Sequence, residues 1–261
     1  MNRTGEKFVS LLRIMERLRG PGGCPWDQRQ GFEELKAYLI DEAYEVLQAI
    51  DSGDRSLLCE ELGDLLFQIV FLAHMAREEG AFDMGHVIEG IEQKMIRRHP
   101  HVFGNGRVSD HRDVTRQWDM IKAREGKSPR TSILSGIPET LPALYRAYRL
   151  GLRAARVGFD WKGLEELLPK VREEWGELEE ALQEKDKAAA GEELGDLLFA
   201  LANLARHLGL EPEGLLRATN SKFVQRFQWV EEALHREGRS PTEATLEEMD
   251  RLWEEAKTHY P

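Results

Sequence analysis

Two matching groups of acidic side chains are the part of this sequence best suited to chemistry. Residues 60–67 read EELGDLLF, and the same eight letters return at 192–199, an offset of 132 residues. An identity of this length at a fixed offset indicates that one module has been duplicated. The same offset relates two further pairs of glutamates, Glu42 and Glu45 in the first copy and Glu174 and Glu177 in the second.

Each copy sets two acid pairs on neighbouring predicted helices. Glu42 and Glu45 are three residues apart and therefore share a helix face, as do Glu61 and Asp64. The short connection at residues 51–56 makes the two helices antiparallel neighbours, and both pairs flank apolar stripes. Packing the stripes together would bring four carboxylates towards one point, where they repel unless they are protonated or neutralised.

A divalent cation is the natural neutraliser of such a group, because Mg²⁺ is commonly held by carboxylates together with substrate phosphates. A solvated helix face is the usual explanation of a single E-x-x-E pair, and it becomes the less favoured alternative for two pairs beside apolar stripes in both copies. A di-iron centre needs two Glu-x-x-His motifs, and the sequence has this spacing at Glu232 and His235 alone. The candidate metal ligands and catalytic residues are Glu42, Glu45, Glu61 and Asp64 in the first copy, and Glu174, Glu177, Glu193 and Asp196 in the second.

A glycine stands inside one acid-bearing helix of each copy, at Gly63 and Gly195. Glycine within a helix costs about 1 kcal/mol relative to alanine. We therefore expect another group to approach the backbone closely at both positions. Tight packing between helices explains the two glycines equally well.

Basic and aromatic side chains follow the acid groups along the chain in both copies. Lysine or arginine near a carboxylate–metal site can clamp phosphate oxygens, and tryptophan can stack on a base. Helix-end charge explains part of the basic set as well, and core packing explains the tryptophans as well. The candidate substrate-binding residues are Lys94, Arg97, Arg98 and Trp118, followed by Lys222, Arg226, Trp253 and Lys257.

Nearly every segment has helical periodicity, and the alternating pattern of strands is missing. We predict an all-α fold of two duplicated four-helix modules that form helical bundles. Glycine and proline concentrate at 126–142, which we interpret as a linker between domains at 1–125 and 143–261. The predicted helices span 35–50, 58–77, 84–98 and 113–124 in the first module, and 165–183, 189–207, 212–235 and 246–260 in the second.

Composition excludes several classes of partner. The 261 residues include 36 basic and 47 acidic side chains, a net charge of −11, which disfavours duplex nucleic acid and anionic membranes. No apolar run approaches a membrane span, and the first residues lack the apolar stretch of a signal peptide, so we expect a cytoplasmic protein. The cysteines, Cys24 and Cys59, match no zinc motif and are expected to be reduced.

Taken together, the motifs resemble the MazG-type nucleoside triphosphate pyrophosphohydrolases of the all-α NTP pyrophosphatase superfamily. The family pattern E-E-x-x-E, followed further along by E-x-x-D, occurs at 173–177 with Glu193 and Asp196. The first copy carries Asp41 in place of the leading glutamate. The two-domain form of the family is also similar in three flanking motifs, at 24–27 (CPWD), 97–104 (RRHPHVFG) and 155–161 (ARVGFDW).

The resemblance implies Mg²⁺-dependent hydrolysis of an NTP or dNTP to the monophosphate and pyrophosphate, with Mn²⁺ as an alternative ion. It implies a homodimer with sites near the subunit interface, and a role in nucleotide-pool sanitation or control. By the same resemblance Glu174, Glu177, Glu193 and Asp196 hold the ion and the first-copy acids form a parallel set. Lys222 and Arg226 would contact the triphosphate, and Trp253 the base.

Two alternatives remain open at this point. The C-terminal lobe could be catalytic while the N-terminal lobe binds a nucleotide or a partner as a regulatory module, a reading that Asp41 motivates. A plain helical dimerisation scaffold would bind no nucleotide at all.

Overall fold

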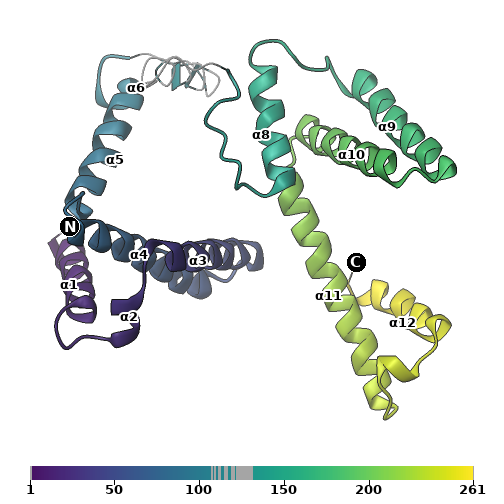
Figure 1. The fold of residues 1–261 in the computed structure, drawn as a ribbon, viewed down its shortest axis with the longest axis horizontal. Helices are drawn as coiled ribbons and strands as arrows, with labels where there is room; N and C mark the ends of the chain where they lie inside the picture. The colour runs from purple at the N-terminus through teal and green to yellow at the C-terminus, as the bar shows by residue number, and fades with distance from the viewer. Residues whose placement is uncertain are drawn as a thin grey trace. The chain divides into compact units, whose positions relative to one another are not determined.

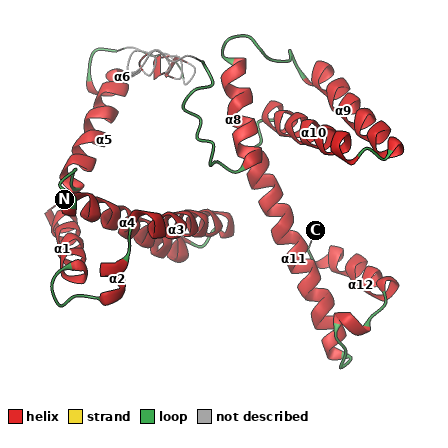
Figure 2. Cartoon of the chain, viewed as in Figure 1, coloured by secondary structure: helices red, strands yellow, loops and turns green. Residues whose placement is uncertain are grey.

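The computed structural model describes residues 2–106, 108, 110, 113–114, 117–118, 121 and 132–260. Regular structure in this part of the chain is entirely helical, as Figure 2 shows, so the predicted all-α class is confirmed. The chain divides into two compact units, Met1–Gly126 and Lys127–Pro261. Residues 126–131 of the predicted linker lie outside the described residues. None of the described helices combines the length and the apolar composition that a membrane span requires.

The first unit is built around a hairpin of two long helices, α3 and α4. Gly53 ends α3 in the left-handed conformation (φ 75°), which glycine adopts without strain. Asp54 then caps α4 by accepting hydrogen bonds from the backbone of Ser56 and Leu57. The helices are α1 (Asn2–Arg19), α2 (Pro25–Arg29), α3 (Phe32–Ser52), α4 (Arg55–Glu78), α5 (Met84–Arg98) and α6 (Pro100–Phe103), as labelled in Figure 1.

The core of the first unit lies where α1, α3 and α4 meet. Its buried members are Met15 on α1, Leu35 on α3, and Val70, Phe71 and Met75 on α4. Burying large apolar side chains at this point fixes the hairpin against α1 and holds the acid-bearing turns of α3 and α4 in register.

The second unit repeats the hairpin in α9 and α10. Lys185 takes the left-handed conformation (φ 59°) at the position of Gly53, and Asp186 caps α10 as Asp54 caps α4. The two turns therefore match both in sequence position and in hydrogen bonding. The helices are α8 (Ala143–Ala155), α9 (Leu164–Glu184), α10 (Lys187–His207), α11 (Pro212–Arg236) and α12 (Leu246–His259), with a short 3₁₀ turn η1 (Pro241–Glu243).

Apolar packing in the second unit falls into two regions. Leu167, Leu178 and Leu197 are buried on α9 and α10, and α8 packs against α10. Val230 and Leu234 of α11 form a separate cluster with Leu252 of α12. Figure 1 shows α11 leading away from the α9–α10 hairpin and α12 lying against its far half.

The structure corrects two expectations. Each module begins with a helix that the sequence analysis did not identify, α1 in the first unit and α8 in the second. The close approach expected at Gly63 and Gly195 is wrong within the chain, because a Cβ at either position would meet no described atom within 4 Å. Both glycines lie on exposed helix surface. The helix predicted at 113–124 lies largely outside the described residues.

The close contact that requires glycine lies elsewhere, at Gly151 on α8. A Cβ there would collide with Oδ1 of Asn203 on α10. Asn203 is 1% exposed and cannot move freely, because Nδ2 donates to the carbonyl of Phe199 and Oδ1 accepts from Nε of Arg206. Glycine therefore sets the distance between α8 and α10.

We predict that Gly151→Ala lowers the free energy of unfolding by about 1–3 kcal/mol, because the added methyl group overpacks this contact. Urea unfolding followed by circular dichroism measures the change. Gly191→Ala on exposed α10 surface is the matched control, and it should raise stability by up to about 1 kcal/mol. Equal effects of the two substitutions would contradict the close packing.

Candidate metal-binding carboxylate sites

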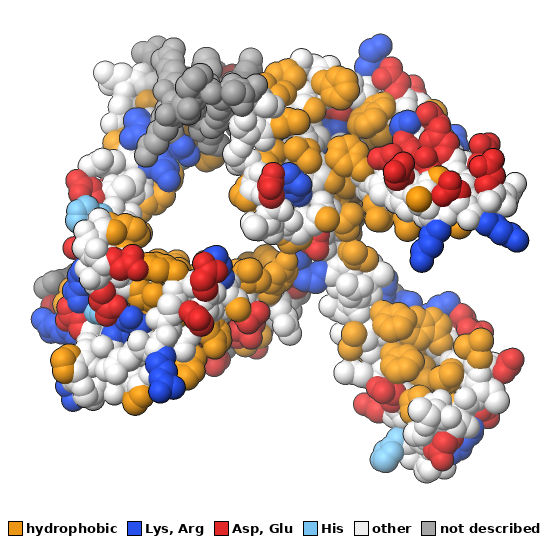
Figure 3. Space-filling model, viewed as in Figure 1, with side chains coloured by type: hydrophobic (Ala, Val, Ile, Leu, Met, Phe, Trp, Pro, Cys, Tyr) orange, Lys and Arg blue, Asp and Glu red, His pale blue; other side chains and the backbone are white. Residues whose placement is uncertain are grey.

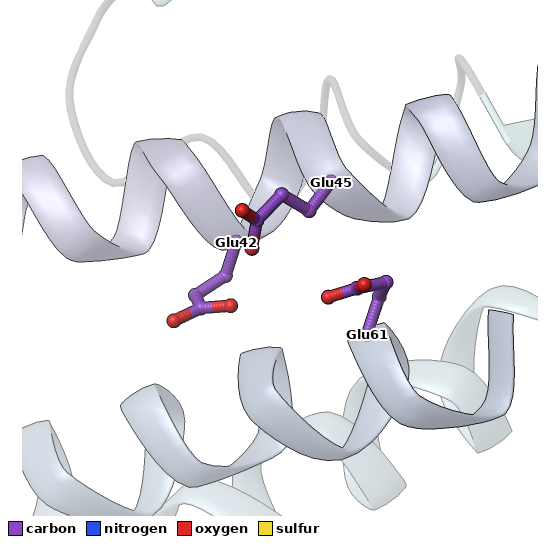
Figure 4. A group of neighbouring side chains, drawn as sticks. All are labelled: Glu42, Glu45 and Glu61. Carbon is purple, nitrogen blue, oxygen red and sulfur yellow. The ribbon is translucent and has the colours of Figure 1, made fainter. Parts of the chain in front are cut away.

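The N-terminal cluster joins two glutamates of α3 with one of α4. One carboxylate oxygen each from Glu42, Glu45 and Glu61 lies within 4.8 Å of the other two. Figure 4 shows the three side chains reaching into the space between the two helices. Glu42 is partly buried and accepts a hydrogen bond of 3.3 Å from Nε2 of Gln68 on α4.

The C-terminal cluster has the same composition on α9 and α10. Oxygens of Glu174, Glu177 and Glu193 again lie within 4.8 Å of one another. Glu174 is the most buried of them, with 8% of its side chain exposed, and it forms an ion pair of 2.8 Å with Nζ of Lys170. Acidic side chains gather over this hairpin in Figure 3.

Crowding of the acids raises several carboxyl pKa values. Burial raises the pKa of Glu42, and the charges of Glu45 and Asp64 add to it against the opposing hydrogen bond from Gln68. Burial and the nearby Glu45 likewise raise the pKa of Glu61. In the second copy the pKa of Glu193 is raised by burial and then by neighbouring acids, Glu177 first among them. Each cluster is therefore short of positive charge.

The two aspartates of the predicted ligand sets lie at the edge of these clusters. Asp64 and Asp196 are exposed, and neither supplies an oxygen to the closely spaced groups. Each is still near enough to raise the pKa of a clustered glutamate, Glu61 for Asp64 and Glu193 for Asp196. The structure thus brings six of the eight predicted ligands together, and the two aspartates remain within electrostatic reach.

The donor set fits a hard divalent cation. Three carboxylates converge from two rigid helices, and the clusters contain neither histidine nor cysteine. Such an oxygen set suits Mg²⁺, which usually keeps several positions for water or substrate phosphate. Softer ions such as Zn²⁺ are held chiefly by nitrogen and sulfur ligands, which the clusters lack.

The predicted substrate-binding residues of the second copy form a group of their own on α11 and α12. Nε of Arg226 donates to the carbonyl of Tyr260 at 2.9 Å, and its guanidinium lies 5.8 Å from the ring centre of Trp253. Lys257, on the same helix as Trp253, pairs with Glu254. The contacts of Arg226 and Lys257 thus stay within α11, α12 and Tyr260, rather than reaching the acids of the α9–α10 hairpin.

A cavity of about 300 Å³ opens beside Trp253 in this group. Its lining is aromatic and aliphatic except for Asp250, and apolar side chains are visible over α11 and α12 in Figure 3. Lys222 lies on α11 one turn before Arg226. The lining residues include Phe223, Phe227, Leu246, Met249 and Trp253.

The predicted substrate-binding residues of the first copy lie along and beyond α5. Lys94, Arg97 and Arg98 occupy the second half of that helix. Trp118 lies edge-on to the ring of His99, with 4.9 Å between ring centres. Trp118 therefore lies at the C-terminal end of the basic helix α5, whereas Trp253 lies beside the middle of α11.

Each flanking motif that precedes an acidic hairpin is held by an arginine. In CPWD, Nη1 of Arg19 donates to the carbonyl of Asp27, and the same guanidinium pairs with Glu78 at 2.7 Å. In ARVGFDW, Arg206 donates two hydrogen bonds to the carboxylate of Asp160, and Nε2 of His207 lies 3.0 Å from it. The motifs thus fasten the first helix of each module to the hairpin.

The ARVGFDW motif also borders a cavity of about 600 Å³ that the sequence did not reveal. It lies between α8, α10 and the loop that precedes α9. Asn203 and Arg206 supply polar groups at a wall that is otherwise largely apolar. The apolar part of the lining includes Leu150, Phe159, Trp161 and Phe199.

Sequence reasoning missed Lys170 and Gln68, the side chains that touch the two most buried glutamates. The spacing of Lys170, four residues before Glu174, is a signal that could have found it, because such residues are neighbours on a helix. Gln68 comes from α4, the neighbouring helix, so sequence spacing from Glu42 gives no sign of its contact.

The fold and the sites define an all-α protein with two carboxylate clusters suited to a divalent cation. The protein-family model for the MazG nucleotide pyrophosphohydrolase domain matches it twice, at residues 30–103 and 162–231, and each match contains one cluster. The chain belongs to the MazG nucleotide pyrophosphohydrolase family, a family of hydrolases.

Several relatives match along nearly the whole chain. The nucleoside triphosphate pyrophosphohydrolase/pyrophosphatase MazG of Thermotoga maritima is 45% identical over 257 residues, which cover 98% of each chain. The nucleoside triphosphate pyrophosphohydrolase of Escherichia coli K12 is 46% identical over 251 residues, or 95% of each. A crystal structure of a mazG-related protein from Thermotoga maritima covers 44% of this chain and 98% of its own, with 30% identity and a TM-score of 0.39.

The ion pair of Asp160 should give stability a defined pH dependence. The hydrogen bond from Arg206 lowers the pKa of Asp160 from 3.8 to about 2, so the stabilisation is present above the unfolded value and is lost as pH falls towards 2. We predict that Asp160→Asn costs about 1–2 kcal/mol at neutral pH. The difference from the parent should shrink as pH falls from about 4 to about 2.

Urea unfolding at several pH values checks this prediction. Glu166→Gln is the control, because Glu166 pairs with an exposed lysine, Lys162, and should contribute much less. A cost for Asp160→Asn that does not change with pH would contradict the ion pair.

Proposed function

We propose that this protein hydrolyses nucleoside triphosphates, ribo or deoxy, to the monophosphate and pyrophosphate with Mg²⁺ as the required ion and Mn²⁺ as a substitute. The observation that carries the proposal is the pair of three-carboxylate clusters, one in each region matched by the family. The names of the relatives from Thermotoga maritima and Escherichia coli K12, which match over nearly the full length, support the substrate class. We place the activity in the sanitation or control of nucleotide pools.

The roles of the carboxylates follow from their positions. Glu174, Glu177 and Glu193 would hold the ion in the second copy, and Glu42, Glu45 and Glu61 in the first. When bound, Mg²⁺ neutralises phosphate charge and stabilises the charge that develops on the leaving group. The same carboxylates can accept hydrogen bonds from a water molecule and hold it in line with the bond that breaks. Asp64 and Asp196 add negative charge at the edge of each site and would complete the ligand sets.

We further propose that the active form is a homodimer in which the basic residues meet the acids of a second copy. Arg226 and Trp253 lie on α11 and α12, where they contact each other and Tyr260 rather than the acids of the α9–α10 hairpin. The α9–α10 hairpin also leaves large apolar side chains exposed, and another helical hairpin could cover them. These side chains are Leu168, Trp175 and Leu182 on α9, and Leu194, Leu198 and Leu201 on α10.

A second candidate divides the labour between the lobes. The C-terminal cluster would be catalytic, and the N-terminal cluster would bind a nucleotide or a partner for regulation. Two differences favour it: Asp41 replaces the leading glutamate, and Glu42 meets the neutral Gln68 where Glu174 meets the charged Lys170.

The double variant Glu61→Gln with Glu193→Gln should lower Mg²⁺-dependent pyrophosphate release at least about 100-fold, because each cluster loses a charge needed to hold the ion. Phosphate detection after added inorganic pyrophosphatase, across NTPs and dNTPs, measures release. The single variants assign activity to one lobe or to both.

Glu60→Gln with Glu192→Gln is the matched control, since these neighbours lie outside the clusters and should leave release near the parent value. Undiminished release from the Glu61–Glu193 double variant, or from the parent after chelation of divalent ions, would refute the metal-dependent mechanism.

Leu198→Glu should convert the dimer to a monomer, because a charge among the exposed apolar side chains of the α9–α10 hairpin would have to be buried in the interface. Size-exclusion chromatography with light scattering reports the mass. Val157→Glu places the same charge on an exposed apolar residue outside the α9–α10 hairpin, and this variant should remain dimeric. A monomeric parent, or a dimeric Leu198→Glu variant, would overturn this interface.

A further inference from the structure

The two carboxylate clusters differ in the side chain that meets their most buried glutamate. Nζ of Lys170 lies 2.8 Å from Oε1 of Glu174 and 2.8 Å from Oε1 of Glu173. At the equivalent position of the first copy, four residues before Glu42, stands Tyr38. The C-terminal cluster therefore contains a positive charge where its N-terminal counterpart has a phenol.

The partner of Glu42 differs as well. Glu42 accepts from the amide of Gln68 on α4, and the equivalent residue on α10 is Ala200. A neutral amide satisfies the hydrogen-bonding capacity of an oxygen but leaves the negative charge uncompensated. A lysine ammonium donates a hydrogen bond and also compensates the charge. The negative charge of the N-terminal cluster is therefore left for a cation to compensate. In the C-terminal cluster Lys170 already compensates part of that charge.

Lys170 contacts the carboxylate of Glu174, one of the three that would hold a metal ion. Glu174 has 8% of its side chain exposed, and a buried carboxylate is costly without a partner, so its contact with the ammonium is strong. Lys170 also has a second, more exposed acceptor in Glu173, whose side chain is 55% exposed. The ammonium can therefore leave Glu174 for an arriving cation while keeping its pair with Glu173.

We propose that Lys170 is a built-in counter-ion that competes with the divalent cation for Glu174, so that the C-terminal site binds free cation more weakly than the N-terminal site. The inference rests on the proposed metal sites and deepens them. At a given concentration of free ion the N-terminal cluster fills first. The C-terminal cluster stays partly neutralised by its own lysine until the ion displaces it.

Titration calorimetry with Mn²⁺, without nucleotide, tests this on the full-length chain. Two backgrounds isolate the clusters, and each is checked by circular dichroism for native helicity. One silences the N-terminal cluster with Glu42→Gln, Glu45→Gln and Glu61→Gln, and the other silences the C-terminal cluster with Glu174→Gln, Glu177→Gln and Glu193→Gln.

In the background that keeps the C-terminal cluster, Lys170→Met should tighten Mn²⁺ binding roughly tenfold, because a charge-assisted hydrogen bond no longer has to be displaced. Lys170→Arg keeps the charge and should stay close to the parent. Lys162→Met removes a surface ion pair of the same lobe and should change nothing. Unchanged or weaker Mn²⁺ binding by Lys170→Met would overturn the proposal that Lys170 competes with the cation.

The reciprocal exchange keeps the inference falsifiable if Lys170→Met does not fold. In the background that keeps the N-terminal cluster, Tyr38→Lys should weaken Mn²⁺ binding roughly tenfold, while Tyr38→Met should not. Equal affinity in these two variants would overturn the competition. Absence of Mn²⁺ binding in both backgrounds would instead refute the metal sites themselves, and the counter-ion with them.

Discussion

Repulsion among carboxylates held close together is the constraint on which the rest of this structure depends. Six glutamates are fixed in two groups, each with oxygens within 4.8 Å, at a cost that burial and like charge make visible in the raised pKa values of Glu42, Glu61 and Glu193. Such groups persist only where packing elsewhere over-determines them. The buried contacts of Leu35 and Phe71 in one unit, and of Leu167 and Leu197 in the other, supply that determination.

The hairpin turn converts sequence spacing into a site. Asp54 and Asp186 cap the second helix of each hairpin, and a left-handed residue ends the first, so the two acid-bearing helices leave the turn in a defined register. The glutamate on the second helix then faces the pair on the first. Lys185 adopts the same left-handed conformation as Gly53. The turn geometry is therefore kept even where a side chain makes that conformation sterically costly.

Local periodicity explains what could be predicted, and tertiary contact explains what could not. The acid pairs follow from three-residue spacing, and their meeting follows from a short connection between apolar stripes. The helices α1 and α8 were missed because they lie outside the repeated motif, and their place is set by contacts such as Gly151 against Asn203. No spacing rule places Arg226 or Trp253 relative to the acids, since Arg226 lies on α11, a long helix that leads away from the hairpin, and Trp253 lies on α12 beyond it. The close approach expected at Gly63 and Gly195 failed because propensity alone does not identify which face of a helix is covered.

Duplication has kept the acids and changed what surrounds them, and this has a physical consequence. A site that repels its own charges can be relieved by an external cation or by an internal one, and the two solutions compete for the same oxygens. In the first copy Gln68 meets Glu42 as a neutral donor, which leaves the charge for an ion. In the second copy Lys170 meets Glu174 as a charged donor, which reduces the repulsion within the cluster and also reduces the free energy that an arriving ion can gain. Two clusters with the same ligands need not therefore load at the same ion concentration, and a single chain can hold one strong and one weak site for the same cation.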